Sequence, residues 1–334
     1  MTILENISLK PYNTFHINIQ ARKAVFIDTP DELIETLQTS EVKKNNYLIL
    51  GGGSNVLFVN DFDGLVIFPE ITGISVIQET AEHVLVEAGA GEDWDDFVAY
   101  TVEKGWAGLE NLSLIPGHVG ASPIQNIGAY GVEAGQVIEK VHVLEINTGK
   151  KYGLSNNDCG FGYRSSIFKY AQKGRFVITS VVYRLHKNLT PNIGYGNLAD
   201  EIQSIGSNTL GNIRQAVINI RNSKLPDPEK LGNAGSFFKN PEISSDRYDS
   251  LRKKYPDIPG FPVGDRIKIP AAFLIDRCGW KGYTKGDAGV HQNQPLVLVN
   301  YGKATGFEIL KLAESIQTSV STTFDIDLEM EVNV

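Results

Sequence analysis

The sequence predicts a folded enzyme of mixed α and β structure, built from two or three domains. Three observations carry this prediction: a length of 334 residues, a composition of 42% hydrophobic and 21% charged residues, and a content of 33 glycines. A chain of this length exceeds one average domain and can bury a large core. Glycine permits sharp turns and close backbone approaches to a ligand. The composition therefore favours a folded enzyme over a disordered or fibrous chain.

Apolar patterns and turn signals give the order of the expected elements. A helix is expected to begin at Asp28 to Glu32 and to run through Leu37, because Pro30 suits the first turn. Strands are expected at 47–50, 56–59, 65–68, 84–87, 141–146, 176–182, 183–185, 296–299 and 325–332, and further helices at 93–104, 212–221, 270–276 and 307–320. The cluster of helix-breaking residues from Lys224 to Pro228 marks a domain boundary.

Charge and hydropathy argue against several classes of protein. The net charge is −8 and no long basic run occurs, which argues against nucleic acid as the main partner. No apolar run approaches the ~20 residues that a membrane span needs, and residues 1–11 lack a signal core. Cys159 and Cys278 form no CxxC pair, which fits a reducing compartment. We expect a cytoplasmic protein with no membrane association and no obligatory protein partner.

Two glycine-rich stretches are the strongest local signals. The first glycine stretch, Gly51-Gly52-Gly53-Ser54-Asn55, lies between two runs that read as extended. Consecutive backbone N–H groups in such a run can face one concavity and hold a diphosphate. The dinucleotide-binding Rossmann unit needs a helix after its glycines, so that fold is not expected. One glycine triplet alone is equally compatible with a tight β turn.

The second glycine stretch runs from Pro116 to Gly131 and shows little periodicity. Ordered loops of this length usually carry a function. Its candidate ligand-binding residues are Pro116, Gly117, Gly120, Ala121, Ser122, Gln125, Asn126, Gly128, Ala129, Tyr130 and Gly131. Two such stretches in one chain favour a ligand that bears phosphate.

Five motifs resemble one known family. They are Asn13-Thr14-Phe15, the first glycine stretch, Ile115-Pro116-Gly117 with the second glycine stretch, residues 162–169 (GYRSSIFK) and residues 233–241 (NAGSFFKNP). In this order they resemble the UDP-N-acetylenolpyruvoylglucosamine reductase family, flavoenzymes that complete UDP-N-acetylmuramate for bacterial peptidoglycan. The similarity covers nearly the whole chain. Tyr195 resembles the tyrosine that the longer class of this family folds over its bound substrate.

The resemblance implies an α+β fold with an FAD-binding half of the vanillyl-alcohol-oxidase type. Its expected parts are a first FAD-binding subdomain at 1–67, a second at 68–221 with 325–334, and a substrate-binding domain at 222–324. Because the first glycine stretch contains no histidine or cysteine, we expect FAD to be bound non-covalently. The implied hydride donor is NADPH and the implied substrate is a UDP-sugar enolpyruvyl ether.

The resemblance also assigns catalytic roles. Hydride from reduced FAD would reach the vinyl carbon, and charge would build up toward the substrate carboxylate as an enolate. Arg164 and Glu331 are expected to stabilise that charge, and Ser236 to donate the proton. The family has Pro-Glu-Val near its C-terminus, whereas this chain has Met330-Glu331-Val332. Glu329 therefore remains an alternative to Glu331.

Other residues match substrate-side positions of the family. Lys224 and Asn240 match positions near the nicotinamide nucleotide or the substrate diphosphate, and Gln294 matches a substrate-side glutamine. The six histidines are scattered, without HxH or HExxH spacing, so no metal site is expected.

Three alternative functions stay open at this stage. One is a hydrolase that uses Ser236 with His291 as base, although the sequence lacks a GxSxG elbow. The second is an FAD-dependent oxidase of an alcohol or sugar. The third is a flavin or nucleotide sensor without catalysis, which would need no proton donor at Ser236. Bound flavin separates the first alternative from the other two.

Overall fold

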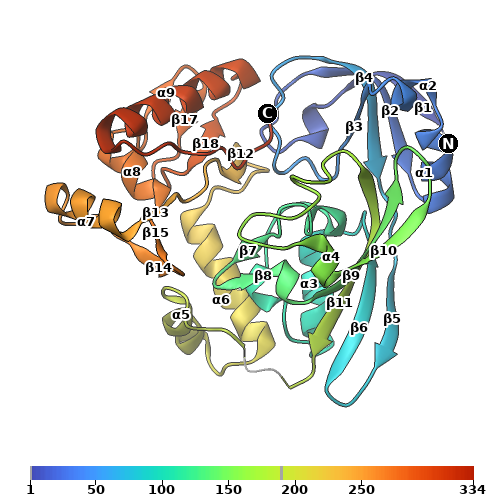
Figure 1. The fold of residues 1–334 in the computed structure, drawn as a ribbon, viewed down its shortest axis with the longest axis horizontal. Coiled ribbons are helices and arrows are strands. Elements are labelled where there is room, and N and C mark those ends of the chain that lie inside the picture. Colours follow the sequence, from blue (N-terminus) through green and yellow to red (C-terminus); the bar gives the residue numbers. More distant parts are fainter. Residues whose placement is uncertain (1, 189–190) are drawn as a thin grey trace. The chain divides into compact units, whose positions relative to one another are not determined.

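The computed structural model describes residues 2–188 and 191–334. The chain divides into two compact units, each with its own arrangement of strands and helices (Figure 1). The first unit contains residues 1–7, 21–52 and 62–223, and the second contains residues 8–20, 53–61 and 224–334. The mixed α and β structure that the sequence predicts is confirmed.

A four-stranded sheet forms one part of the first unit. Its order is β1-β2-β4-β3, with β4 parallel to both of its neighbours. The strands are β1 (Ile3–Ser8), β2 (Gln20–Ile27), β3 (Tyr47–Ile49) and β4 (Phe62–Pro69), and the helices beside them are α1 (Pro30–Leu37) and α2 (Ser40–Lys43). The Thr29 side chain accepts a hydrogen bond from the N–H of Glu32, so α1 begins where the sequence predicts.

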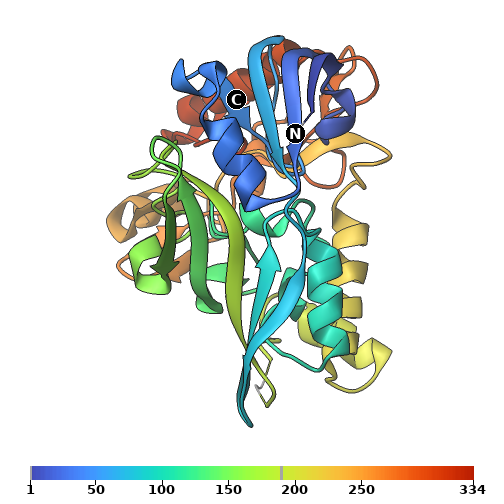
Figure 2. The ribbon, with the colours of Figure 1, turned by 90° about the vertical axis from the view of Figure 1, so that its right-hand side faces the viewer.

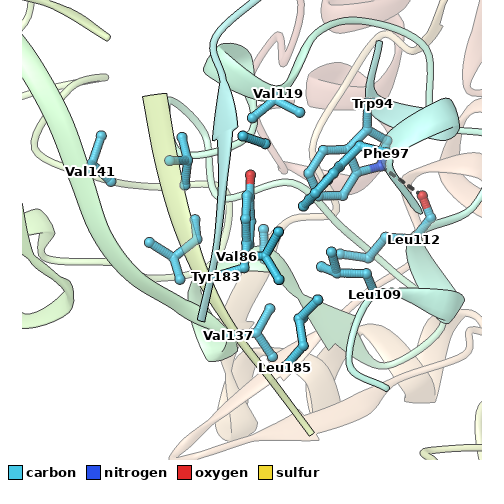
Figure 3. Close-up of a cluster of buried hydrophobic side chains, with 14 of the residues drawn as sticks. Val86, Trp94, Phe97, Leu109, Leu112, Val119, Val137, Val141, Tyr183 and Leu185 are labelled. Carbon is cyan, nitrogen blue, oxygen red and sulfur yellow. Dashed lines mark hydrogen bonds between the residues drawn. The ribbon is translucent and has the colours of Figure 1, made fainter. Parts of the chain in front are cut away.

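A five-stranded antiparallel sheet forms the other part of the first unit, in the order β10-β9-β11-β6-β5. Its strands are β5 (Ile74–Glu79), β6 (His83–Gly89), β9 (Ile138–Glu145), β10 (Lys151–Ser155) and β11 (Phe176–His186). Helix α3 (Trp94–Glu103) lies against one face of this sheet (Figure 2). The buried Trp94, Phe97 and Tyr183 side chains fill the space between helix and sheet, and the Trp94 indole N–H donates to Leu112 O (Figure 3).

The remaining elements of the first unit are short or lie beside α3. They are α4 (Asn156–Cys159), α5 (Leu198–Ile205), α6 (Leu210–Lys224), the short strands β7 (Gly128–Ala129) and β8 (Val132–Glu133), and 3-10 turns at 110–112, 119–121 and 134–136. Helix α6 packs its apolar residues against α5. The last residue of α6, Lys224, is also the first residue of the second unit's C-terminal portion.

The second unit is built on a sheet of order β12-β18-β17-β16 and a smaller sheet of order β13-β15-β14. Its elements are a 3-10 turn at 10–12, β12 (Gly232–Ser236), β13 (Glu242–Ser244), α7 (Ser245–Lys254), β14 (Phe261–Val263), β15 (Arg266–Lys268), α8 (Ala271–Arg277), β16 (Thr284–Lys285), β17 (Ala288–Val290), β18 (Val297–Asn300) and α9 (Gly306–Phe324). Helix α9 begins at a capping box formed by Thr305 and Glu308.

Two expected strands are absent from the structure. Residues 56–59 have no ladder, and Val56 makes a single parallel bridge to Asn333. Residues 325–332 are extended, with Ile326, Leu328 and Val332 buried and Glu329 exposed, but their one bridge joins Met330 to Phe238. The expected alternation of burial is therefore present without a continuous strand partner.

The domain boundaries that the sequence suggests differ from the division into units. The units separate at Ser223 and Lys224, close to the breaker cluster. Residues 325–334, which we expected with 68–221, pack in the unit that contains 224–324. One core cluster joins residues of β2 and β4 to Leu144 of β9 and Val177 of β11, and the expected subdomains 1–67 and 68–221 stay a prediction.

Candidate active site

The two glycine stretches meet within the first unit. A side chain on Gly52 would place its Cβ 3.0 Å from Gly117 Cα and 3.4 Å from His118 Cδ2. A Cβ on Gly51 would lie 3.8 Å from His118 Nδ1. A side chain at position 52 would therefore require the neighbouring backbone to move by a few tenths of an ångström. Gly51, Gly52, Gly117 and His118 are hereafter called the glycine junction.

The backbone N–H groups of the glycine junction are available to a ligand. Within the described residues, no hydrogen bond to the protein is donated by the N–H of Gly51, Gly52, Gly117 or His118. Backbone N–H groups that gather in one place suit an anion such as a diphosphate. The junction is therefore compatible with a diphosphate, and binding of FAD by the two stretches stays a prediction.

The middle of the second glycine stretch has a structural role. The N–H of Val119 donates to Glu92 O, and the N–H of Gly120 donates to Ala90 O. The hydroxyl of Ser122 is fully buried and hydrogen-bonded to that of Tyr183 at 2.8 Å, and Val119 joins the core beside Trp94 (Figure 3). These residues position the stretch, whereas Ala121 is exposed. Burial keeps the pKa of Tyr183 far above its ordinary value, so the phenol stays neutral.

The amide of Asn126 connects three parts of the first unit. Its Nδ2 donates to Glu133 Oε2 at 2.8 Å and to Gly162 O at 3.0 Å, and its Oδ1 accepts from the N–H of Gly135 at 2.7 Å. Asn126 is buried and its amide is used within the protein, and ligand binding by this residue stays a prediction. Its neighbour Gln125 accepts a hydrogen bond from Lys169 Nζ.

Arg164 lies against the end of the second glycine stretch. Its Nη2 donates to Gly128 O at 2.7 Å, and its guanidinium carbon lies 5.5 Å from the centre of the Tyr163 ring. Arg164 has a φ of +50° in a turn closed by Gly162 and Ser165. A side chain on Gly128 would place its Cβ 2.9 Å from Arg164 Nη1, so glycine at 128 makes room for the guanidinium.

The predicted substrate-covering tyrosine lies beside the end of the second glycine stretch. Tyr195 is exposed, and its ring meets the Tyr130 ring edge to face at 6.1 Å between centres. The Asn192 side chain donates to Gly131 O at 3.1 Å, and Asn111 Nδ2 donates to both Tyr130 O and Asn192 O. The structure therefore brings Arg164, Tyr130, Gly131 and Tyr195 to one region of the first unit, next to Ala129 in β7.

Two motifs of the second unit pack directly on each other. The N–H of Asn233 donates to Thr14 O, and a Cβ on Gly232 would lie 2.5 Å from Phe15 O. Gly53, the third residue of the first glycine stretch, has a φ of +59°, and a Cβ there would lie 2.0 Å from Tyr12 O. The motif at 13–15 thus fixes both the start of β12 and the position of Gly53.

Ser236 ends β12 and is exposed. The chain reaches it through Gly235, whose φ is +68° and whose N–H donates to Asn233 Oδ1. No hydrogen bond joins Ser236 to His291 within the described part of the chain, and His291 Nδ1 is buried without a partner there. The serine–histidine pair that a hydrolase would use is therefore not formed.

Glu331 is held next to Ser236 by backbone pairing. The N–H of Glu331 donates to Phe237 O at 2.8 Å, and Glu331 O accepts from Asn55 Nδ2 at 3.3 Å. Asn55 O in turn accepts from the N–H and the side chain of Asn333. Asn55 and Ser54 are both half-buried, and the first glycine stretch thus anchors the segment that carries Glu331.

The alternative residue, Glu329, has a different environment. Its carboxylate forms an ion pair with Lys239, and 64% of its side chain is exposed. Glu331 is half-buried. The choice between Glu331 and Glu329 stays a prediction.

The predicted substrate-binding residues are distributed over the second unit. Asn240 Oδ1 accepts from the N–H of Ala271 at 2.9 Å and so caps α8. Gln294 is half-buried in the turn before β18, where its backbone O accepts from the N–H of Val297. Lys224 is exposed at the end of α6. Their contacts with a ligand remain predictions.

Sequence reasoning missed two groups of positioning residues. Asp95 Oδ1 accepts from the N–H of Leu114, and Arg221 Nε donates to Leu114 O. Leu114 has a φ of +58° and lies two residues before the second glycine stretch. Arg214 forms two hydrogen bonds to Asp95, of 2.5 and 2.9 Å. The second group is His118 alone. No spacing rule along the sequence marks either group.

Two family models match the chain. One, described as the C-terminal domain of UDP-N-acetylenolpyruvoylglucosamine reductase, matches residues 227–334. The other, described as an FAD binding domain, matches residues 21–152. The second match covers the first glycine stretch and the second glycine stretch in full.

Curated proteins named UDP-N-acetylenolpyruvoylglucosamine reductase are similar along the whole chain. That of Flavobacterium johnsoniae is 46% identical, covering 100% of each chain. That of Amoebophilus asiaticus is 48% identical, covering 100% of this chain and 99% of its own. That of Neisseria gonorrhoeae is 47% identical, covering 97% and 95%.

Solved structures agree on the fold. The crystal structure of UDP-N-acetylenolpyruvylglucosamine reductase from Thermus caldophilus has a TM-score of 0.71 and 23% identity, covering 100% of this chain and 99% of that chain. A solvent-stable cholesterol oxidase has a TM-score of 0.50 and 11% identity, covering 98% and 86%. The predicted α+β fold with an FAD-binding domain is confirmed.

Three further observations bear on earlier expectations. No helix among the described residues is long and apolar enough to cross a membrane. Those residues contain no group of three or more His, Cys, Asp or Glu side chains able to hold a metal ion. Cys159 and Cys278 are both free thiols, and burial raises the pKa of Cys159 to about 12.

The Asp95–Arg214 pair yields a prediction about stability. Burial acts to raise the pKa of Asp95, but the hydrogen bonds from Arg214 and Leu114 outweigh it and hold that pKa below its ordinary value. The stabilisation is therefore complete above the unfolded-state pKa of about 4 and is lost as the pH falls through the lowered folded-state pKa. We expect Arg214→Met to reduce the free energy of unfolding at neutral pH by about 2 kcal/mol.

Urea unfolding of wild type and variant measures this difference at neutral pH and along a series down to pH of about 3. The difference should shrink as the solution becomes acidic. Lys151→Met, which breaks an ion pair between exposed side chains, is the control and should change stability by about 0.5 kcal/mol or less. A difference that stays constant with pH would show that the carboxylate of Asp95 is not the partner that matters.

Proposed function

The chain belongs to the UDP-N-acetylenolpyruvoylglucosamine reductase family, and we propose that it reduces UDP-N-acetylglucosamine enolpyruvate to UDP-N-acetylmuramate with NADPH as the hydride donor. It is a reductase of peptidoglycan precursor synthesis with an FAD-binding domain. The observation that carries the catalytic part of the proposal is the pairing of Phe237 with Glu331. This pairing puts the exposed Ser236 hydroxyl and the Glu331 carboxylate on adjacent backbone segments.

The glycine junction supports non-covalent FAD binding. Gly51, Gly52, Gly117 and His118 would hold the diphosphate through backbone N–H groups that have no acceptor within the described residues. Bound FAD supplies hydride chemistry, taking hydride from NADPH and delivering it to the vinyl carbon of the substrate. Binding of the substrate carboxylate, stabilisation of the enolate and proton donation would use the chain's own side chains.

Arg164 suits the task of holding the substrate carboxylate. Its turn is tied to the second glycine stretch at three places: Asn126 Nδ2 binds Gly162 O, Arg164 Nη2 binds Gly128 O, and Ser166 Oγ binds Ile124 O. A guanidinium held in place before the reaction stabilises developing charge without further reorganisation. Such preorganised donors contribute several kcal/mol to a transition state. Arg164 would thus stabilise the enolate.

Ser236 and Glu331 would complete the reaction. The Ser236 hydroxyl, exposed at the end of β12, would deliver its proton to the carbon next to the carboxylate. Glu331, held by Phe237 and Asn55, would stabilise the enolate together with Arg164. Tyr195 would cover the bound substrate, and Lys224, Asn240 and Gln294 would bind its diphosphate or the nicotinamide nucleotide. A cytoplasmic location and roles in cell shape and cell division follow from this function.

Purified protein tests the proposed function directly. We expect a yellow protein with bound flavin, and rapid loss of nicotinamide absorbance when NADPH and UDP-N-acetylglucosamine enolpyruvate are both present. NADPH alone should reduce the flavin once and then stop. The enolpyruvyl substrate alone should cause no flavin reduction. If the purified protein contains no flavin and binds none when FAD is added, the assignment is contradicted. Oxidation of a sugar with oxygen would favour the oxidase alternative.

Ser236→Ala separates the two halves of the reaction. We expect NADPH to reduce the flavin of this variant at the wild-type rate, because the serine has no part in that step. Turnover of the enolpyruvyl substrate should fall by about 100-fold or more, as for loss of a general acid. Stopped-flow absorbance of the flavin and steady-state turnover measure the two quantities. Ser244→Ala, which removes an exposed serine hydroxyl in the same unit, is the control, and wild-type turnover in Ser236→Ala would refute the proton-donor role.

A pair of glutamate variants distinguishes Glu331 from Glu329. Glu331→Gln should lower kcat by about 100-fold, because its carboxylate would act on the reacting atoms. Glu329→Gln should leave kcat within about threefold, since 64% of the Glu329 side chain is exposed and its carboxylate pairs with Lys239. Steady-state kinetics of the two variants under the same conditions decide the assignment. The reverse pattern would assign the catalytic role to Glu329.

A further inference from the structure

One side chain in the glycine junction has no role in the proposed reaction. His118 is half-buried, and its Nδ1 is buried without a hydrogen-bond partner within the described residues. This nitrogen faces Gly51, since a Cβ on Gly51 would lie 3.8 Å from it. The ring's Cδ2 faces Gly52. The imidazole therefore lies along the first glycine stretch, where backbone N–H groups are also unpaired.

The backbone on both sides of His118 fixes where its ring lies. Gly117 O accepts from the N–H of Trp94, and the N–H of Val119 donates to Glu92 O. His118 and Asp93 are thus partners in an isolated antiparallel bridge at the start of α3. Because the glycine at 52 allows the ring to approach, the imidazole is positioned by contacts that do not involve its own nitrogen Nδ1.

A buried nitrogen without a partner is costly. Leaving a buried donor or acceptor unsatisfied removes its hydration without replacing it. Burial lowers the pKa of His118, against the opposite effect of Asp93 and Glu70, which favours the neutral ring with one N–H donor and one acceptor. Such a group is satisfied when a ligand brings a complementary atom to it.

We propose that His118 is an FAD-binding side chain whose Nδ1–H donates a hydrogen bond to an acceptor atom of FAD at the glycine junction. This inference rests on the proposed function, because it requires that the junction binds FAD. It adds a side-chain contact to a site otherwise formed by backbone N–H groups. It also gives a partner to the ring nitrogen that is buried without one among the described residues.

The affinity of the full-length apoprotein for FAD tests the proposal. Titration of FAD, followed by quenching of flavin fluorescence, gives Kd for wild type, His118→Phe and His118→Asn. Phenylalanine keeps a ring but has no nitrogen, so its Kd should rise about tenfold or more. Asparagine carries its amide nitrogen on Cγ, as histidine carries Nδ1, so its Kd should stay within about threefold of wild type.

A matched control and the folding of each variant are part of the experiment. His142→Phe replaces a partly exposed histidine on β9 of the same unit and should leave Kd unchanged. Equal Kd values for His118→Phe and wild type would overturn the inference while the proposed function stands. Equal weakening in His118→Phe and His118→Asn would also overturn it, because the ring would then act by packing. Wild-type apoprotein that binds no FAD would refute the proposed function itself.

A measurement on unmodified protein covers the case in which the variants fail to fold. With ¹⁵N-labelled histidine, the Nδ1 resonance of His118 should shift when FAD is added to the apoprotein. The shifted resonance should show the nitrogen–proton coupling of a protonated Nδ1. The His142 resonances should remain in place. An unshifted Nδ1 resonance in the presence of saturating FAD would overturn the proposal.

Discussion

The buried amide of Asn126 is the interaction on which the first unit's candidate site depends. One side chain satisfies Gly162 O, Glu133 and the N–H of Gly135. Buried amides with all their hydrogen bonds made define a single arrangement of the segments that they join, because every alternative leaves a polar atom unsatisfied. The buried side chain of Asn126 therefore fixes the position of the Arg164 turn relative to the second glycine stretch.

The second unit uses the same device with different residues. Asn55 binds Glu331 O through its side chain and Asn333 through its carbonyl, and Asn233 binds Pro226 O, Leu231 O and the N–H of Gly235. In both units, asparagine side chains hold irregular backbone where no sheet or helix ladder can. The segments that carry the residues proposed to act on the substrate are thus held by hydrogen bonds of asparagine side chains.

Much of the fold could be predicted from the sequence because its signals are local. The helix starts at Thr29 and Asp93 depend on side chains that bond backbone N–H groups three residues away. The extended segment at 325–332 shows the limit of such reasoning. Its alternation of burial is local and was predictable, but its bonding partners, Phe238 and Asn55, lie far away in the sequence.

The sequence predicted which segments form the candidate site better than it predicted the role of each residue in them. The glycines at 51, 52 and 117 were identified from their residue type, and they do meet. Asn126 and Ser122 were expected to bind the ligand, yet their side chains are used inside the protein. His118 escaped notice because burial of one ring nitrogen depends on packing between distant segments, and no pattern along the chain encodes it.

The close contact between Gly120 and Ala90 has a consequence for how such sequences can diverge. A Cβ on Gly120 would lie 2.6 Å from Ala90 Cβ, and the N–H of Gly120 bonds Ala90 O. The backbone bond keeps the two residues together, and the space between them holds one methyl group. Loss of the methyl group at 90 would relieve the shortest contact of a Cβ at 120, but that Cβ would still lie 3.0 Å from Ala90 O and 3.1 Å from Ala90 Cα. An exchange of glycine and alanine between the two positions therefore also needs a shift of the backbone that their hydrogen bond holds together.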